Sequence, residues 1–135
     1  MIVLDASVVV ELITNGPLAA SIMRVMADCD DSFIVPHLLD IEVVSAIRRL
    51  AAGQRIDSHR GQQLLERLDA LPAVRYGHTL LLSRIWELRH NFTAYDAAYI
   101  ALAEVTGSVL YTSDQKLVKG HRARVALFDQ RTINP

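Results

Sequence analysis

The sequence predicts an α/β fold: a single domain with a central, mostly parallel sheet of about five strands and helices on both faces. Three observations indicate this fold. A length of 135 residues suits one domain and leaves no room for two. A hydrophobic share of 51% excludes intrinsic disorder and supports a sizeable core. Short apolar runs alternate with segments of helical period, which favours right-handed crossovers between parallel strands.

The amino-terminal half of the chain predicts strands that alternate with pairs of helices. Ile2-Val3-Leu4 is a short apolar run typical of a buried strand. The breaker Asn15-Gly16-Pro17 separates the first two helices. From Leu38 onward, apolar side chains recur near the helical period until Gly53 ends that helix. The expected strands are 2–4 and 33–35, and the expected helices are 6–14, 18–28, 38–52 and 57–71.

The carboxy-terminal half continues the alternation. Pro72 breaks the chain before a third strand, and Gly107 ends the last long helix. The expected strands are 73–76, 109–111 and 125–128, and the expected helices are 80–90, 94–105 and 114–119. Because no repeat or linker interrupts this order, residues 1–135 are expected to form one domain.

Composition narrows the class of protein. The longest stretch without a charge, Leu12 to Met23, is too short and too broken to span a bilayer. The start of the chain has no basic segment or cleavage site typical of a signal peptide, and Cys29 is the single cysteine. We therefore expect a cytoplasmic protein without a membrane anchor.

The charges are distributed unevenly along the chain. Residues 1–47 carry one basic and seven acidic side chains, whereas residues 48–135 carry the other thirteen basic and eight acidic ones. This asymmetry is compatible with an acidic site beside a basic surface, and equally with a solvated surface of mixed sign.

Two acids come at the ends of predicted strands, and two interrupt apolar helical stretches. Asp5 follows the first strand and Asp114 the fourth. In parallel sheets, the carboxyl ends of the strands line the crevice that commonly holds the site. Glu42 and Asp96 lie in helices where an unpaired charge is costly. Four carboxylates brought together would repel one another and need a cation, and Mg²⁺ and Mn²⁺ prefer oxygen ligands.

Each acid also has a structural alternative. Asp5 and Asp114 could each cap the helix that follows. Asp96 could form a capping box with the threonine three residues before it. Glu42 could pair with Arg49 or another base on a partly exposed helix face. The residue types alone leave these alternatives open, although four separate caps explain the joint pattern less well.

Four segments resemble one known family, in order and at family length. They are residues 2–10, 40–46, 93–103 and 110–117. Together they resemble the PIN-domain ribonucleases, and residues 93–103 closely resemble the VapC toxins of bacterial toxin–antitoxin pairs. The resemblance covers the whole chain and implies a single PIN domain.

This resemblance implies a metal-dependent endoribonuclease that uses Mg²⁺ or Mn²⁺. The implied metal-site acids are Asp5, Glu42, Asp96 and Asp114. Asp40 points to a different side of its helix from Glu42 and is left out. Ser7 and Thr112 fall at hydroxyl positions of the motifs, where they could orient a carboxylate or a metal-bound water, or simply act as caps. Gln115 and Lys116 stand where some members carry another acid, which leaves the number of ions open.

The implied reaction is hydrolysis of an RNA phosphodiester by a metal-activated water, which leaves 5′-phosphate and 3′-hydroxyl ends. The implied partners are RNA, a small antitoxin protein, a second copy of the chain in a homodimer, and a toxin–antitoxin hetero-oligomer. Two alternatives remain: a PIN nuclease in RNA processing without a toxin role, and a non-catalytic α/β regulatory module.

Further side chains are candidates for contacts with RNA or a partner. One basic cluster could steer RNA phosphates or form a solvated surface; it comprises Lys116, Lys119, His121, Arg122 and Arg124. The same question is raised with less support by Arg48, Arg49 and Arg55. Trp86 is interpreted as packing rather than as a stacking platform. An apolar set in the early helices could seat a partner helix or point inward; it comprises Leu12, Ile13, Leu18, Ile22, Met23 and Met26.

Overall fold

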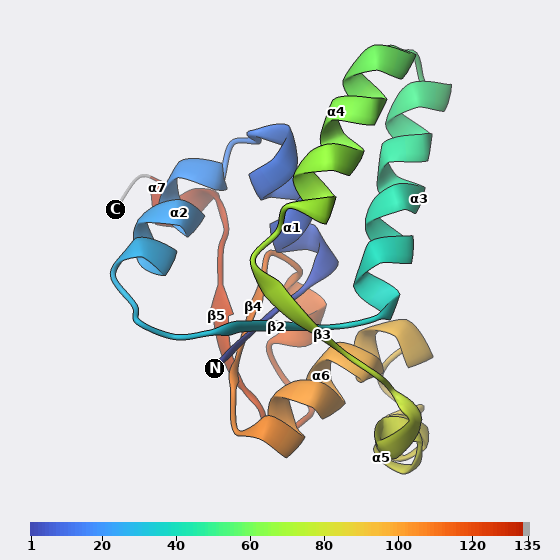
Figure 1. Cartoon of the computed structure of the whole chain (residues 1–135). Coiled ribbons are helices and arrows are strands. Elements are labelled where there is room, and N and C mark those ends of the chain that lie inside the picture. The colour runs from blue at the N-terminus through green and yellow to red at the C-terminus, as the bar shows by residue number, and fades with distance from the viewer. Residues whose placement is uncertain (134–135) are drawn as a thin grey trace.

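The computed structural model of the protein describes residues 1–133 and contains a five-stranded sheet in which every strand pair is parallel (Figure 1). The strand order is β3-β2-β1-β4-β5. The strands are β1 Ile2–Leu4, β2 Phe33–Pro36, β3 Ala73–Tyr76, β4 Val109–Thr112 and β5 Arg124–Leu127. The predicted parallel α/β sheet is therefore confirmed, with β1 at its centre.

Helices cover both faces of the sheet, as right-handed crossovers in a sheet of this order require. They are α1 Ala6–Thr14, α2 Ala19–Ala27, α3 Leu38–Ala52, α4 Ser58–Asp69, α5 Leu82–Glu87, α6 Ala94–Thr106 and α7 Gln130–Ile133. Figure 1 shows α1, α3 and α4 on one side of the strands and α5 and α6 on the other. The predicted end of the long helix at Gly107 is confirmed, because that residue adopts the left-handed conformation that glycine tolerates (φ 64°).

The prediction of one helix over 80–90 is wrong. A 3₁₀ turn at Thr79–Leu81 precedes α5, which ends at Glu87. The following turns are tightened, because the backbone N–H of Arg89 donates to Trp86 and that of Asn91 to Leu88. The expected helix at 114–119 is likewise only a 3₁₀ turn, Gln115–Leu117, and α7 was not expected.

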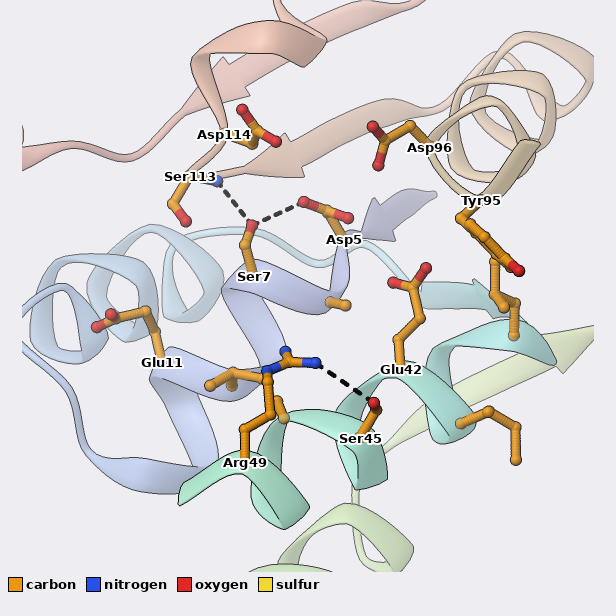
Figure 2. Close-up of a pocket in the computed structure, with 15 residues that line it drawn as sticks. Asp5, Ser7, Glu11, Glu42, Ser45, Arg49, Tyr95, Asp96, Ser113 and Asp114 are labelled. Carbon is orange, nitrogen blue, oxygen red and sulfur yellow. Dashed lines mark hydrogen bonds between the residues drawn. The ribbon is translucent and has the colours of Figure 1, made fainter. Parts of the chain in front are cut away.

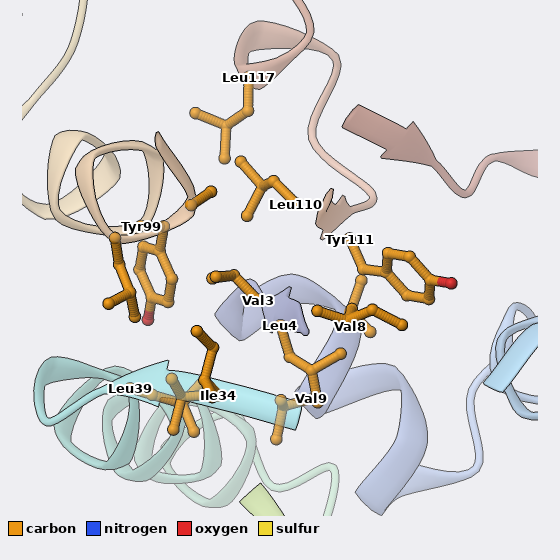
Figure 3. Packing of buried hydrophobic residues seen from close by; sticks show 14 of the residues in the cluster. Val3, Leu4, Val8, Val9, Ile34, Leu39, Tyr99, Leu110, Tyr111 and Leu117 are labelled. Atoms are coloured by element: carbon orange, nitrogen blue, oxygen red, sulfur yellow. The ribbon is translucent and has the colours of Figure 1, made fainter. Parts of the chain in front are cut away.

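The core lies between the two helix layers and the sheet. All three residues of β1 are buried, which is typical of a strand that has helices on both faces. Figure 3 shows Tyr99 of α6, Val9 of α1 and Leu39 of α3 packed around side chains of the central strands. This packing fixes the carboxyl edge of the sheet relative to the helices that begin there.

The apolar side chains of α1 and α2 mostly point inward. Of the six considered for a partner groove, Ile13, Leu18 and Ile22 are buried in the core, and Leu12 and Met26 pack partly against it. Met23 alone among these six is exposed. A groove for a partner helix on α1 and α2 is therefore not formed by these residues.

Two bidentate ion pairs join elements across the fold. Arg75 of the edge strand β3 donates to both carboxylate oxygens of Asp40 in α3, at 2.7 and 2.9 Å. Arg84 of α5 donates to both oxygens of Glu104 in α6, at 2.7 and 3.0 Å. The first pair explains why Asp40 takes no part in the site.

Among residues 1–133, no single helix is long and apolar enough to cross a membrane. Taken together, α1 and α2 pass the same test by length and composition, although the chain bends by 106° between them.

The assigned core predicts that the substitution Leu→Ala changes the free energy of unfolding much more at a buried position than at an exposed one. Leu110 of β4 is fully buried, whereas Leu80 is 95% exposed. We expect Leu110→Ala to lower the free energy of unfolding by about 2–5 kcal/mol, because it leaves a cavity in the core. The matched control Leu80→Ala is expected to change it by less than about 0.5 kcal/mol. Chemical denaturation measures both, and equal effects of the two variants would contradict the assigned core.

Candidate active site

The carboxyl edge of the sheet gathers acids from four elements around one cavity of about 760 Å³ (Figure 2). β1 and β4 are parallel neighbours, so Asp5 and Asp114, which follow them, lie at the same edge. Glu42 reaches the cavity from the first turns of α3, and Asp96 from the first turn of α6. All four predicted acids therefore line a single cavity.

Asp5 is the buried member of this group, with 5% of its surface exposed. The hydroxyls of Ser7 and Thr112 both donate to its Oδ2, at 2.7 and 2.8 Å. Each hydroxyl in turn accepts a backbone N–H, Ser7 from Ser113 and Thr112 from Asp114, both at 3.0 Å. The loop after β4 therefore holds the two hydroxyls, and they hold one oxygen of the carboxylate.

The capping alternative for Asp5 is not realised. Asp5 occupies the N-cap position of α1 in extended conformation, but its side chain forms no capping hydrogen bond with that helix. Its backbone N–H donates to the carbonyl of Tyr111 at 2.9 Å, which ties the residue to β4. Because both hydroxyl bonds use Oδ2, neither of them occupies Oδ1.

Glu42 is held by a residue that the sequence analysis missed. The hydroxyl of Tyr99, which is fully buried in α6, donates to Glu42 Oε2 at 3.0 Å. Tyr99 lies three residues after Asp96 and so on the same face of its helix, which is the signal that could have identified it. Glu42 forms no ion pair with Arg49 in the described chain, so that alternative is not realised.

Asp96 and Asp114 combine helix capping with a place on the cavity wall. Thr93 caps α6 by accepting the backbone N–H of Asp96 at 3.1 Å, which leaves the Asp96 carboxylate out of that bond. Asp114 does cap the turn that follows it, because its Oδ1 accepts the N–H of Lys116 at 2.9 Å. The capping alternative for Asp114 is therefore correct, and it coexists with a place in the site.

The acids of the cavity disfavour one another's charge. Burial raises the pKa of Asp5, and the charge of Asp114 adds to this, while the bonds from Ser7 and Thr112 oppose it. Burial also raises the pKa of Asp96, together with the charges of Asp5 and Asp114. The anionic forms are thus held in the folded chain at an electrostatic cost.

Glu42 belongs to the same electrostatic group. Burial is the main cause that raises its pKa, and the charges of Asp5 and Asp96 add to it. The hydrogen bond from Tyr99 acts in the opposite direction, since it stabilises the carboxylate. A cation among these groups would relieve the repulsion of all of them at once.

The cavity wall contains further side chains that were not assigned to the site. Glu11 lies one turn after Ser7 on α1, and its Oε2 accepts the backbone N–H of Leu18 at 2.9 Å. Its carboxylate therefore fixes the entry into α2. Arg49 and Tyr95 also line the cavity, as Figure 2 shows.

The predicted basic cluster after β4 does not line the cavity. His121 serves the loop instead: its Nδ1 accepts the N–H of Ala123 at 3.1 Å, which leaves Nε2 to donate to the Leu117 carbonyl at 2.7 Å. Burial raises the pKa of Asp96, and the charge of Lys116 opposes this rise in part. Trp86 does not pack in the core, since it is 67% exposed with the guanidinium of Arg89 at 4.3 Å from its ring centroid.

The donor set fits a hard divalent cation in chemistry and in charge. Carboxylate oxygens are the ligands that Mg²⁺ and Mn²⁺ prefer. Burial and the charges of neighbouring acids raise the pKa of Asp5, Glu42 and Asp96. Within residues 1–133, no three His, Cys, Asp or Glu side chains already have an arrangement that could hold a metal ion. The acids thus surround the cavity without converging on one point.

Comparison with known proteins identifies the family and agrees with the fold. The profile of the PIN domain matches residues 2–121. The VapC ribonuclease Mb0985 of Mycobacterium bovis is 38% identical over 117 residues, which cover 87% of this chain and 88% of that protein. Ribonuclease VapC12 of Mycobacterium tuberculosis is 36% identical over 129 residues, which cover 94% of this chain and 98% of its own.

Solved structures share the fold at lower identity. VapBC2 from Rickettsia felis, bound to a DNA fragment from its promoter, superposes with a TM-score of 0.71 at 12% identity, covering 96% of this chain and 100% of its own. FitAcB from Neisseria gonorrhoeae superposes with a TM-score of 0.70 at 16% identity, covering 93% and 96% respectively.

The raised pKa of Asp5 predicts that neutralising its side chain stabilises the fold. Asp5→Asn keeps an oxygen for the hydroxyls of Ser7 and Thr112 but removes a buried charge. Because the pKa of Asp5 is raised on folding, its ionised form destabilises the folded state above the pKa of the unfolded chain. We expect a higher melting temperature for this variant at pH 7 in a chelator, by about 3–6 °C for each kcal/mol relieved. Exposed Asp30→Asn is the matched control, and a lower melting temperature for Asp5→Asn would contradict the prediction.

Proposed function

The chain belongs to the PIN-domain family, and from that premise we propose that it is a Mg²⁺- or Mn²⁺-dependent endoribonuclease that acts as the toxin of a toxin–antitoxin pair. The observation that carries the proposal is the gathering of Asp5, Glu42, Asp96 and Asp114 around one cavity. Relatives at 36–38% identity that bear the names of VapC ribonucleases support it.

The four acids would bind the ion in different ways. Asp5 and Asp96 would be its direct ligands, and Glu42 and Asp114 would bind it directly, through water, or with a second ion. When bound, a divalent ion supplies an attacking water of lowered pKa and stabilises the leaving 3′ oxygen of a phosphodiester. No histidine among residues 1–133 lines the cavity, so the carboxylates are the groups that this wall offers for the chemistry.

Hydroxyl groups orient these acids. Ser7 and Thr112 act as positioning residues, since their hydroxyls hold Asp5 Oδ2 in place. Tyr99 has the same role for Glu42. Such partners of ligating side chains preserve ligand orientation, and their loss typically costs metal affinity and activity.

The proposed partners follow from the same premise. A solved toxin-antitoxin complex from Klebsiella pneumoniae shares the fold with a TM-score of 0.66, which supports a small antitoxin as partner. A basic antitoxin side chain would complement the acids of the cavity. We also propose a homodimer that joins the antitoxin in a hetero-oligomer, and the cytoplasm as the compartment, because the substrate RNA is found there.

Loss of a direct ligand tests the nuclease. We expect the wild-type chain to cleave RNA in Mg²⁺ or Mn²⁺, and we expect this cleavage to stop in excess chelator. Asp96→Asn is expected to lower the cleavage rate by at least about 100-fold, since it removes a ligand rather than a ligand's partner. Cleavage-site mapping on total RNA measures both and identifies the target. Full activity of Asp96→Asn would refute the proposal.

Growth of a bacterial host that expresses the chain tests the toxin role. Induced expression of the wild-type chain in a bacterial host is expected to arrest growth, whereas Asp96→Asn is not. Normal growth with an active nuclease would instead favour a role in RNA processing.

The hydroxyl groups that bind Asp5 give a second test of the proposed metal site. We expect Thr112→Val to weaken Mn²⁺ binding by about 10–100-fold, because it removes one of the bonds that orient Asp5. Thr112→Ser keeps the hydroxyl and is expected to restore most of the affinity. Calorimetric titration of both variants checks this, and equal Mn²⁺ affinity for Thr112→Val and wild type would show that the hydroxyl does not position the ligand.

A further inference from the structure

Besides its acids, the cavity has an apolar rim on one side. Tyr95 lies in the first turn of α6 beside Asp96 and is 62% exposed. Leu38 and Ile41, the latter 70% exposed, line the cavity from α3. The Tyr95 side chain is mostly outside the core, so its ring is available to a flat ligand that enters the cavity.

A guanidinium lies across Glu42 from Tyr95. Arg49 follows Glu42 by seven residues and Ser45 by four, a spacing that places all three on one face of α3. Its Nη1 donates to the neutral Ser45 hydroxyl at 3.3 Å. In Figure 2, Glu42 lies between Arg49 and Tyr95.

The nearby acids do not neutralise Arg49. Glu11 also lines the cavity, but its carboxylate accepts the N–H of Leu18, and that of Glu42 accepts the Tyr99 hydroxyl. Among residues 1–133, no ion pair includes Arg49, whereas two of the three nitrogens of the Arg75 guanidinium donate to one carboxylate. The guanidinium is therefore exposed at the cavity and available to an anion.

We propose that Tyr95 and Arg49 form two subsites for single-stranded RNA, one on each side of the scissile phosphodiester. The ring of Tyr95 stacks on an unpaired base, and the guanidinium of Arg49 binds a backbone phosphate, a group that matches its planar fork. This inference rests on the proposed nuclease function, because it assigns the substrate of the same cavity.

The two subsites select a class of RNA. A base within a duplex has both faces covered by its neighbours, so it must leave the stack before it can cover Tyr95. An unpaired base has no such cost. The cavity therefore binds loops and single strands in preference to duplexes, and Tyr95 is the residue on which that preference depends.

Binding can be measured without cleavage. The probe is a fluorescent six-nucleotide single-stranded RNA, and the parent is the Asp96→Asn protein with Mg²⁺. We expect Tyr95→Ala to bind at least about fivefold more weakly and Tyr95→Phe to bind like the parent. We expect Arg49→Ala to weaken binding and to reduce the slope of log affinity against log salt concentration by about 0.7.

Matched controls separate these subsites from a general surface effect. Trp86 is an exposed aromatic residue and Arg48 an exposed base on α3, and neither lines the cavity. Trp86→Ala and Arg48→Ala are expected to bind the RNA like the parent. All variants alter exposed side chains, and thermal unfolding verifies that each is folded. Binding of the RNA by Tyr95→Ala or Arg49→Ala within twofold of the parent would overturn the inference. This holds even if the same variant weakens binding of a protein partner.

Cleavage by proteins that retain Asp96 separates this inference from the proposed function. We expect Tyr95→Ala and Arg49→Ala to raise KM more than they lower kcat. If the wild-type chain cleaves RNA and both variants match it in KM, the subsites are wrong and the nuclease stands. If no RNA is cleaved but the variants lose RNA binding, the nuclease is wrong, and the two residues bind single-stranded RNA without a scissile bond between them.

Discussion

A carboxylate is placed where the fold nearly excludes water, and the rest of the site is arranged around it. Asp5 follows the central strand, and burial is the main cause that raises its pKa. Its orientation comes from α1, through the hydroxyl of Ser7, and from β4, through the hydroxyl of Thr112 and the carbonyl of Tyr111. Because a buried charge persists only where it is paired, hydrogen-bonded or bound to a metal, this position links the sheet topology to cation chemistry.

The topology explains why the other acids come from segments distant in sequence. Helices α1 and α3 begin at the carboxyl ends of β1 and β2, and α6 begins at the same edge before it returns to the start of β4. Each element can place an acid in its first turns without disturbing the apolar contacts deeper in the sheet. The core and the site therefore use different parts of the same helices, which is why α6 can be buried from Ala97 to Ala103, directly after Asp96.

Local patterns predicted most of this arrangement. Short apolar runs, helical periodicity and breakers depend on neighbouring residues, and the position of acids after strands is visible in the sequence. The hydrogen bond from Tyr99 to Glu42 was missed, although the spacing from Asp96 carries a signal for it. The place of Arg49 on the cavity wall was not predicted either, because packing decides which helix face meets the cavity. The break near Leu88 was missed for a related reason: residues 80–90 have helical composition, but i→i+3 bonds tighten the chain after α5.

A helix cap and a place on the cavity wall are compatible for part of the site. Asp114 caps a 3₁₀ turn with Oδ1 and lines the cavity, so the backbone N–H of Lys116 fixes the direction of its carboxylate. Thr93 does the equivalent for Asp96 by capping α6 and setting where the first turn begins. A cap therefore argues neither for nor against a functional role. What distinguishes these acids from ordinary caps is that their charges act on other elements: the charge of Asp114 adds to the raised pKa of Asp5, and that of Asp96 to the raised pKa of Glu42. Isolated helix starts would not produce this effect.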